Sequence, residues 1–195
     1  MEQITQKKLY LVSGRVSEPL AHEVADLMGE ELGEPNLAEF SNGEIHCKFS
    51  ESIRGSDVFI LQTHCHTEEI SINDALMEQL IMVDAAKRAS AKRITVVCPH
   101  YGYARQDRKS SGREPITAKL VANLFKGAGA SRLIGVDLHS GQIQGFFDGP
   151  VDHLTAMPVL VERLKSLEGD LAIVSPDAGR VKVAERYAMQ LGADL

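Results

Sequence analysis

A basic stretch from Pro99 to Arg113, PHYGYARQDRKSSGR, holds the side chains of this chain that are best suited to bind phosphate. Its arginine and lysine side chains gather in a chain whose net charge is −6, against the overall composition. Planar guanidinium groups make bidentate contacts with phosphate oxygens. The stretch follows a strand-like apolar run, Arg93 to Cys98 (RITVVC), so we expect it at the carboxyl end of a strand, where open α/β sheets bind ligands. A solvated basic loop is the alternative interpretation.

A second polar segment, DLHSGQIQGFF from Asp137, follows another apolar run, Arg132 to Val136 (RLIGV). Two strand ends with charged tips suggest one shared site. Asp137 and His139 are two positions apart, so on an extended strand end they would point to the same side. Magnesium prefers oxygen ligands, and by chemistry alone His139 is better interpreted as a buried or capping histidine.

Length and composition indicate a globular protein. The chain has 195 residues, 44% of them hydrophobic, which is enough for a substantial core. Its acidic balance, 5% aromatic content and lack of Trp disfavour a nucleic-acid binder and favour a small anionic ligand. Cys47, Cys65 and Cys98 form no C-x-x-C pair, so we expect a reducing, cytoplasmic location. The first residues look unlike a signal peptide, and no apolar run approaches the roughly 18 residues of a membrane span.

The first part of the chain predicts a strand, a helix and a hairpin. Leu9 to Ser13 predicts a strand, and Ser17 is a candidate cap for a helix from Glu18 to about Leu32 that Gly33 would stop. The expected buried side of this helix carries Leu20, Val24, Leu27 and Met28. An Asn-Gly pair at Ser41-Asn42-Gly43 predicts an antiparallel hairpin, and it is flanked by extended segments at Leu37 to Phe40 and Glu44 to Phe49.

The middle of the chain continues the alternation. Asp57 to Thr63 predicts a buried strand, and Asn73 to Ser90 is the clearest helix. The apolar stripe of that helix is Leu76, Met77, Leu80, Ile81 and Val83, and Asp84 and Arg88 form an i,i+4 pair. Pro115 begins a further helix that Gly127 and Gly129 end. Alternating strands and helices predict an α/β fold with a mostly parallel sheet and an antiparallel hairpin added to it.

The pattern begins again beyond Asp152. A helix is expected from Pro158 to Leu167, a strand from Leu171 to Ser175 and a helix from Gly179 to Leu191. One strand and two helices cannot close a sheet of their own, so we expect the chain to stop partway into a second domain.

Other signals carry less weight. Neither a dinucleotide fingerprint nor a Walker phosphate loop is present in the sequence. Adjacent residues on an extended segment point to alternating faces, which disfavours zinc at His64-Cys65-His66. Cys98 lacks a neighbouring base in the sequence and is interpreted as a small buried residue, not as a nucleophile. Tyr101 and Tyr103 either stack on a base or cover the end of the sheet.

Four segments together resemble one family, the ribose-phosphate pyrophosphokinases, also called phosphoribosyl pyrophosphate synthetases. They are FSNGE at Phe40 to Glu44, RQDRK at Arg105 to Lys109, DLHSGQIQGFFDGPVDHL at Asp137 to Leu154 and SPDAGR at Ser175 to Arg180. The resemblance runs from about Lys8 to Leu195 in the family's order. It implies a phosphoribosyltransferase-like domain at residues 1–154, and at residues 155–195 the beginning of a second domain of the same type, truncated.

The resemblance implies that the β,γ-pyrophosphoryl group of ATP is transferred to ribose 5-phosphate, leaving AMP. It implies ATP-binding positions in the hairpin and in the basic stretch, at Phe40, Asn42, Gly43, Glu44, Arg105, Gln106 and Asp107. The hairpin positions hold adenine in a neighbouring subunit, which implies a homo-oligomer, commonly a hexamer. It also reverses the interpretation of His139, which with Asp177 matches magnesium-associated positions. Asp137 is a further candidate ligand, and Asp148 and Asp152 lie in the same acidic neighbourhood.

The resemblance also leads to expectations about an allosteric site and about which of the family's loops this sequence contains. An allosteric site for phosphate or ADP at a subunit boundary is implied at Lys109, Arg113, Gln144 and Asp152. The family's catalytic loop with its lysine and arginine, and its ribose-phosphate loop of the type D-D-x-x-x-T-G-G-T, have no counterpart in this sequence. We therefore expect the 195-residue chain alone to be inactive. The alternative is a noncatalytic nucleotide-binding regulatory subunit of a synthetase oligomer.

Overall fold

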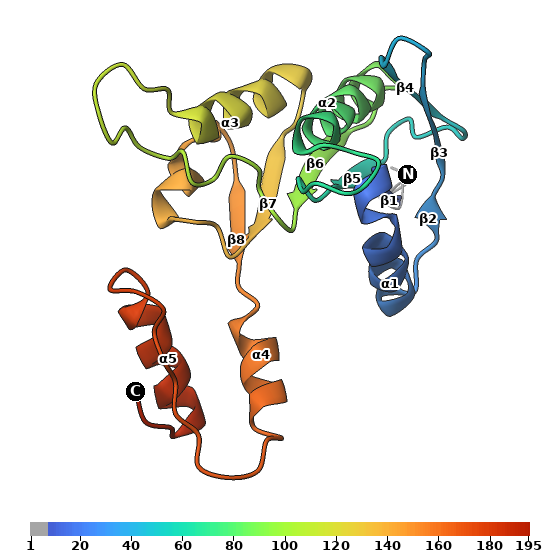
Figure 1. Ribbon diagram of the computed structural model, residues 1–195. Helices are drawn as coiled ribbons and strands as arrows, with labels where there is room; N and C mark the ends of the chain where they lie inside the picture. Colours follow the sequence, from blue (N-terminus) through green and yellow to red (C-terminus); the bar gives the residue numbers. More distant parts are fainter. Residues whose placement is uncertain (1–7) are drawn as a thin grey trace, which may run out of the picture. The chain divides into compact units, whose positions relative to one another are not determined.

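The computed structural model describes residues 8–195. The chain divides after Leu154 into two compact units, Met1–Leu154 and Thr155–Leu195, each described here by itself (Figure 1). The expectation about a signal peptide falls partly on residues 1–7, outside the described residues. Between residues 8 and 195, no helix combines the length and the apolar character needed to cross a membrane.

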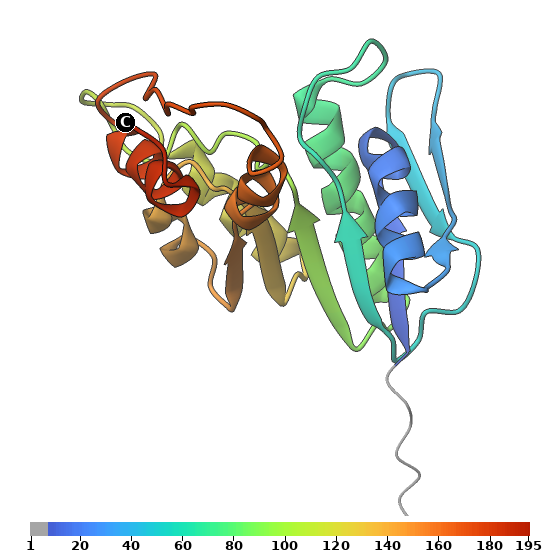
Figure 2. The same ribbon diagram turned by 90° about the horizontal axis from the view of Figure 1, so that it is seen from below.

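A parallel sheet of six strands forms the centre of the first unit, as the alternating pattern predicted (Figure 2). In spatial order its strands are β2 (Leu32–Gly33), β1 (Leu9–Ser13), β5 (Asp57–Leu61), β6 (Arg93–Cys98), β7 (Arg132–Val136) and β8 (Val151–Leu154). Every neighbouring pair in it is parallel. All six carboxyl ends therefore meet at one edge of the sheet, which is the edge where both polar segments emerge.

Helices cover both faces of this sheet. α2 (Ile72–Arg88) and α3 (Thr117–Ala128) lie side by side on one face, and α1 (Glu18–Met28) lies on the other (Figure 1). The main core forms between the sheet and the first of these layers, with Val58, Val96 and Phe125 fully buried in it. Two short 3-10 helices, η1 (Arg15–Ser17) and η2 (Gly141–Gly145), follow strands β1 and β7.

The predicted hairpin is confirmed as β3 (Pro35–Glu39) paired antiparallel with β4 (Ile45–Phe49). Its turn differs in detail from a two-residue type I′ turn. The N–H of Gly43 donates to the Phe40 carbonyl and that of Phe40 to the Glu44 carbonyl, and Gly43 alone takes a left-handed φ of 89°. This is a three-residue loop with glycine at its left-handed position, where a residue without Cβ is unstrained.

The prediction for α1 was wrong at its end and on its buried face. The helix stops at Met28 because Gly29, at φ 67°, turns left-handed and donates to the Ala25 carbonyl. Leu32 and Gly33 then pair with β1 instead of ending a helix. The side chains buried beneath α1 are Ala21 and Ala25, while Leu27 is 89% exposed.

Ser17 does not cap this helix with its side chain. Its hydroxyl accepts a hydrogen bond from the backbone N–H of Thr63 at 2.7 Å. The hydroxyl therefore joins the end of β1 to the segment after β5.

The α2 prediction holds for the helix and fails for Met77 on the expected buried face. A capping box between Ser71 and Asp74 begins the helix. Met77, expected in the core, is 53% exposed, whereas Glu78 and Gln79 are fully buried. The Glu78 carboxylate accepts from the backbone N–H of Arg15 at 2.8 Å and from its guanidinium at 2.5 Å. The carboxylate is therefore paired, as a buried charge must be.

His64 and Gln79 form a second buried polar pair behind the carboxyl edge of the sheet. His64 Nε2 lies 2.8 Å from Gln79 Oε1, and the Gln79 amide donates to the backbone carbonyls of Ile60 on β5 and Val97 on β6. His64 Nδ1 accepts from the backbone N–H of Gly102 at 2.9 Å, so Nε2 carries the proton. Burial lowers the pKa of His64 to about 4, which keeps the imidazole neutral.

The second unit contains two helices, α4 (Met157–Leu164) and α5 (Val181–Leu191), which pack against each other. The strand expected from Leu171 to Ser175 does not form. Only an isolated bridge between Ala172 and Asp194 occurs there. A strand needs a hydrogen-bonded neighbour along its length, and within the described part of this unit the segment has one bridge partner.

His64 makes the stability of the fold dependent on pH. Its folded-state pKa lies below the unfolded value, so its stabilising contribution is complete above pH 6.5 and is lost as the pH falls toward 4. We expect the free energy of unfolding of the wild type to fall between pH 7 and 4.5 by on the order of 2 kcal/mol more than that of His64→Gln. Urea unfolding at both pH values measures this. Parallel losses in the two proteins would contradict the expectation.

Candidate functional site

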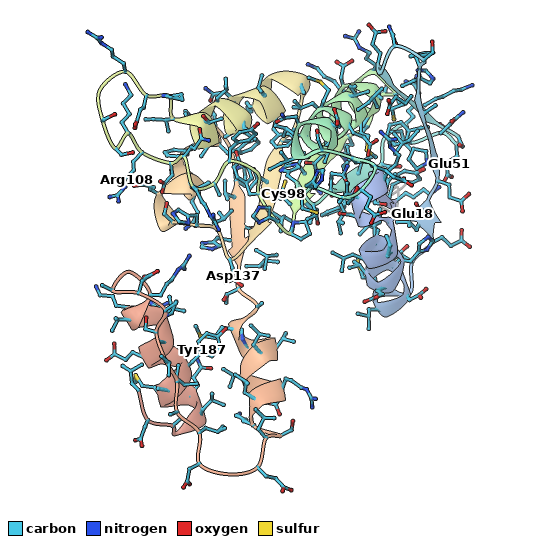
Figure 3. The ribbon with its side chains drawn as sticks, in the orientation of Figure 1. Glu18, Glu51, Cys98, Arg108, Asp137 and Tyr187 are labelled. Atoms are coloured by element: carbon cyan, nitrogen blue, oxygen red, sulfur yellow. The ribbon has the colours of Figure 1, made fainter. Side chains whose placement is uncertain are left out.

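Two loops at the carboxyl edge of the sheet carry the residues that the sequence singled out. The loop between β6 and α3 holds Arg105, Gln106, Asp107 and the other cations of the basic stretch. The segment after β7 holds Asp137 and His139, both exposed. Because β6 and β7 are neighbouring parallel strands, these two segments begin side by side. In Figure 3, Arg108 projects from the first loop, and Asp137 lies at the tip of β7.

The loop after β6 is fixed to the core at its beginning. Its Gly102 N–H donates to the buried His64 ring, and an added Cβ at Gly102 would lie 2.9 Å from the Cβ of His64. Tyr101 is 2% exposed, and its hydroxyl donates to the Ala118 carbonyl of α3 at 2.9 Å. Tyr101 therefore covers the end of the sheet and is not available to stack on a base.

Backbone strain occurs at the start of both segments. Tyr103 has a φ of 62° and Asp137 a φ of 44°, both in the left-handed region that non-glycine residues rarely adopt. The Tyr103 hydroxyl bonds the Asn73 side chain on α2, and the Asp137 N–H donates to the Leu154 carbonyl at 2.9 Å. These contacts hold the chain in turns that place the following residues at the edge of the sheet.

The loop's two carboxylates are engaged by neutral donors. Glu114 accepts hydrogen bonds from the backbone N–H groups and hydroxyls of Ser110 and Ser111, and these bonds lower the pKa of Glu114 to about 2. The Asp107 carboxylate accepts from the Ser140 hydroxyl and the Gln142 amide, and its pKa is lowered chiefly by the Ser140 bond.

Among the residues that the structure describes, the cations of this loop consequently have no carboxylate partner. Within residues 8–195, no ion pair forms at any of the four, which are Arg105, Arg108, Lys109 and Arg113. Arg88 pairs with Asp84 and Arg132 pairs with Asp152, which shows that cations elsewhere in the chain do use the available carboxylates. The loop therefore presents positive charge to the solvent at the ligand-binding edge of the sheet.

The residues expected to hold magnesium lie in both units. Asp137 and His139 follow β7 in the first unit. Asp177 lies in the second, where its Oδ1 accepts from the Arg180 N–H at 3.0 Å before α5. No group of three or more His, Cys, Asp or Glu side chains in the described part of the chain is arranged to hold a metal ion. Magnesium usually binds through one or two carboxylates together with waters and nucleotide phosphates, and in the first unit Asp137 is the expected ligand that has such a carboxylate.

The hairpin residues do not meet the loop residues within one chain. Phe40 is 56% exposed beside His46, with ring centroids 5.7 Å apart, and Asn42 accepts from the Glu44 N–H at the turn. In Figure 1 the β3–β4 hairpin and the loop before α3 lie at opposite ends of the first unit. Within the first unit, the hairpin and the loop before α3 are therefore separate surfaces.

The four candidate allosteric residues differ in their surroundings. Lys109 and Arg113 are exposed on the loop, and Arg113 has a left-handed φ of 68°. Asp152 on β8 is paired with Arg132 at 2.5 Å, and the Gln144 amide donates to the Gly141 carbonyl. The carboxylate of Asp152 is thus already neutralised by a neighbouring strand.

Sequence reasoning missed the residues that hold these loops in place. Ser140, Gln142 and Glu114 make the bonds described above. In the sequence, His64 stands out only as part of the His64-Cys65-His66 segment. Only the Glu114 contacts could have been suspected from the sequence, because Glu114 follows the two serines by three and four positions. Cys98 is fully buried as expected, and burial raises the pKa of its thiol to about 12.

A parallel sheet with charged loops at its carboxyl edge is the architecture of open α/β proteins that bind ligands at strand tips. The chain matches a family described as the N-terminal domain of ribose phosphate pyrophosphokinase over residues 9–129. It is 55% identical over 190 residues to the ribose-phosphate pyrophosphokinase of Bifidobacterium longum, covering 95% of this chain and 55% of that protein. It is 51% identical to that of Bacillus caldolyticus, covering 97% of this chain and 59% of the relative.

A solved structure supports the same assignment. The crystal structure of phosphoribosylpyrophosphate synthetase from Mycobacterium smegmatis matches with a TM-score of 0.90 at 51% identity, over 96% of this chain and 62% of that one. The chain therefore belongs to the ribose-phosphate pyrophosphokinase family. It spans less than two thirds of the length of the relatives it matches.

Gly102 tests whether the loop depends on close contact with His64. We expect Gly102→Ala to destabilise the fold by about 1–3 kcal/mol, because the new methyl group overlaps a side chain that the core holds on all sides. Gly127→Ala is the matched control. Gly127 lies in α3 with open space around it, so the same substitution should stabilise by about 0.5–1 kcal/mol. Denaturant unfolding measures both changes, and equal effects would show that the contact is not restrictive.

Proposed function

We propose that this chain provides the ATP side of a ribose-phosphate diphosphokinase, which transfers the β,γ-pyrophosphoryl group of ATP to ribose 5-phosphate. Family membership supports the reaction. The observation that carries the proposal for this chain is the loop after β6. Its four cations lack carboxylate partners within the described residues and lie at the ligand-binding edge of the sheet.

Arg105 and Gln106 are proposed to contact the ATP phosphates. Arg105 is exposed, and a guanidinium forms two parallel bonds with a phosphate. The Gln106 backbone is anchored, since its carbonyl accepts from the Ala118 N–H at 3.1 Å and its N–H donates to the Tyr103 carbonyl at 2.9 Å. A fixed backbone reduces the entropy that the loop would lose on binding.

His139 and Asp177 are proposed to hold Mg²⁺ together with the phosphates, with Asp137 as a third ligand. A bound Mg²⁺ would supply neutralisation of phosphate charge during the transfer. The contribution of this chain is then positioning and charge. Arg105 would contact the phosphates, and the exposed residues Asp137 and His139 follow β7 at the same edge of the sheet. No covalent enzyme intermediate is required.

Phe40, Asn42, Gly43 and Glu44 are proposed to hold the adenine of a neighbouring subunit, which makes the active assembly a homo-oligomer, a hexamer as is common in the family. Their place at the end of the first unit opposite the loop after β6 supports this, because an ATP bound at that loop would lie away from the hairpin of its own chain. An exposed aromatic such as Phe40 offers a stacking surface to a base. Phosphate or ADP is proposed as an effector at Lys109, Arg113, Gln144 and Asp152.

The second unit is proposed to be the beginning of a second domain of the same type. It buries few apolar side chains, and Val159, Val174 and Met189 are more than 70% exposed. A chain extended to the length of the relatives would carry the catalytic and ribose-phosphate loops, whereas the 195 residues alone would not form the product. AMP production from ATP and ribose 5-phosphate by the 195-residue chain would contradict this proposal.

Binding of Mg·ATP tests the role of the loop. We expect Arg105→Ala to weaken Mg·ATP binding by about 10-fold to 100-fold, the equivalent of one or two charge-assisted hydrogen bonds. Isothermal titration calorimetry measures the dissociation constant. Arg88→Ala removes the same charge from an exposed position at the end of α2, where Arg88 pairs with Asp84, and should change the affinity by less than about twofold. Equal affinities of the wild type and Arg105→Ala would overturn the assignment.

A further inference from the structure

Asp107 joins the two loops that carry the proposed site. It lies in the loop after β6 and is 7% exposed. Its Oδ2 accepts from the Ser140 hydroxyl at 2.5 Å and from the Gln142 amide at 2.8 Å. The Gln142 amide also donates to the backbone carbonyl of Asp107 at 3.2 Å. Both partners belong to the segment that follows β7, so a single side chain connects the two strand tips.

The residues next to this joint are the ones proposed to bind ATP and metal. On one side Asp107 follows Arg105 and Gln106 directly, and on the other Ser140 follows His139. The two donors to Asp107 are neutral, and the carboxylate is turned away from the solvent that the four loop cations face. A carboxylate repels phosphate, so a buried, internally bonded one is better suited to hold the loops than to touch the nucleotide.

We propose that Asp107 is a positioning residue that fixes the spacing between Arg105 and His139 by bonding Ser140 and Gln142, and that it does not contact the nucleotide. This inference rests on the proposed function, because it assigns Asp107 a role in the same site. It replaces the expectation that Asp107 is itself an ATP contact. Removing the joint leaves both loops attached to their strands and loosens the arrangement between them.

A double-mutant cycle on Mg·ATP binding tests the inference. Asp107→Ala, Ser140→Ala and the double variant are titrated by calorimetry well below their melting temperatures. A positioning role predicts that each single variant weakens binding by up to about tenfold, and that the double variant is within about twofold of the weaker single. A nucleotide contact by Asp107 predicts instead that Ser140→Ala binds like the wild type, or that the two effects multiply. Either of these results would overturn the inference.

Arg105→Ala, measured alongside, separates this inference from the proposed function. If Arg105→Ala binds Mg·ATP like the wild type, the proposed function fails. If Arg105→Ala weakens binding while the Asp107 and Ser140 effects multiply, only the positioning role fails.

Hydrogen exchange without ligand provides a second readout that does not depend on nucleotide binding. Loss of the joint should raise the exchange rate of backbone amides in residues 139–145 in both Asp107→Ala and Ser140→Ala, by about tenfold for a lost charge-assisted hydrogen bond. Asp26→Ala, the same truncation at an exposed position of α1, is the matched control and should leave these rates unchanged. Unchanged rates in the Asp107→Ala protein would contradict the inference.

Discussion

The hydrogen bond between His64 and Gln79 is the interaction on which the position of the site depends most. Gln79, on α2, donates hydrogen bonds to backbone carbonyls of β5 and β6 and is also bonded to His64. The His64 ring in turn accepts a hydrogen bond from the N–H of Gly102, at the start of the loop after β6. The same neutral imidazole stacks on Phe125 of α3, with centroids 5.9 Å apart. One buried side chain therefore sets the loop relative to the strands and to the helix that follows it.

Such an arrangement is stable only when every polar atom in it has a partner, because an unpaired buried group costs about 1–3 kcal/mol. Both ring nitrogens of His64 and both ends of the Gln79 amide meet that requirement. Glycine at position 102 is needed for a steric reason, since its amide must approach the His64 ring while no side chain comes between them. The buried Glu78, which is paired with the partly exposed Arg15, fixes the neighbouring end of β1 in a similar way. The carboxyl edge of the sheet is thus held by polar contacts behind it, and the solvent-facing loops remain free to carry charge.

The sequence predicted the elements that periodicity controls and missed those that tertiary contacts control. Arg93–Cys98 and Arg132–Val136 were predicted to the residue, because continuous apolar runs are typical of strands covered on both faces. The helix face of α1 was wrong because small residues, Ala21 and Ala25, allow close packing that a hydrophobicity pattern does not reveal. β8 was missed since its short run, Val151–Leu154, contains an aspartate and a histidine.

The residues of the candidate site also fall into two groups, those that a sequence pattern selects and those that depend on tertiary contacts. Arg105 stands out by its residue type and by its place after a strand, so a pattern selects it, whereas His139 was assigned to the site only through the family resemblance. Asp107 and Ser140 are not selected by such a pattern, because their partnership joins segments more than thirty positions apart and exists only after β6 and β7 have paired.

The two acids of the loop, Glu114 and Asp107, explain why its cations form no ion pair among the described residues. Glu114 and Asp107 lie close in sequence to four basic residues and could have neutralised them. Instead Glu114 is bound by the N–H and hydroxyl groups of Ser110 and Ser111, and Asp107 by Ser140 and Gln142. Neutral donors satisfy the hydrogen-bonding capacity of a carboxylate without using an arginine to do so. The acids of the loop stabilise its shape, and its bases form no ion pair among the described residues. A chain of net charge −6 can in this way present a local positive surface at the edge of the sheet where the parallel strands end.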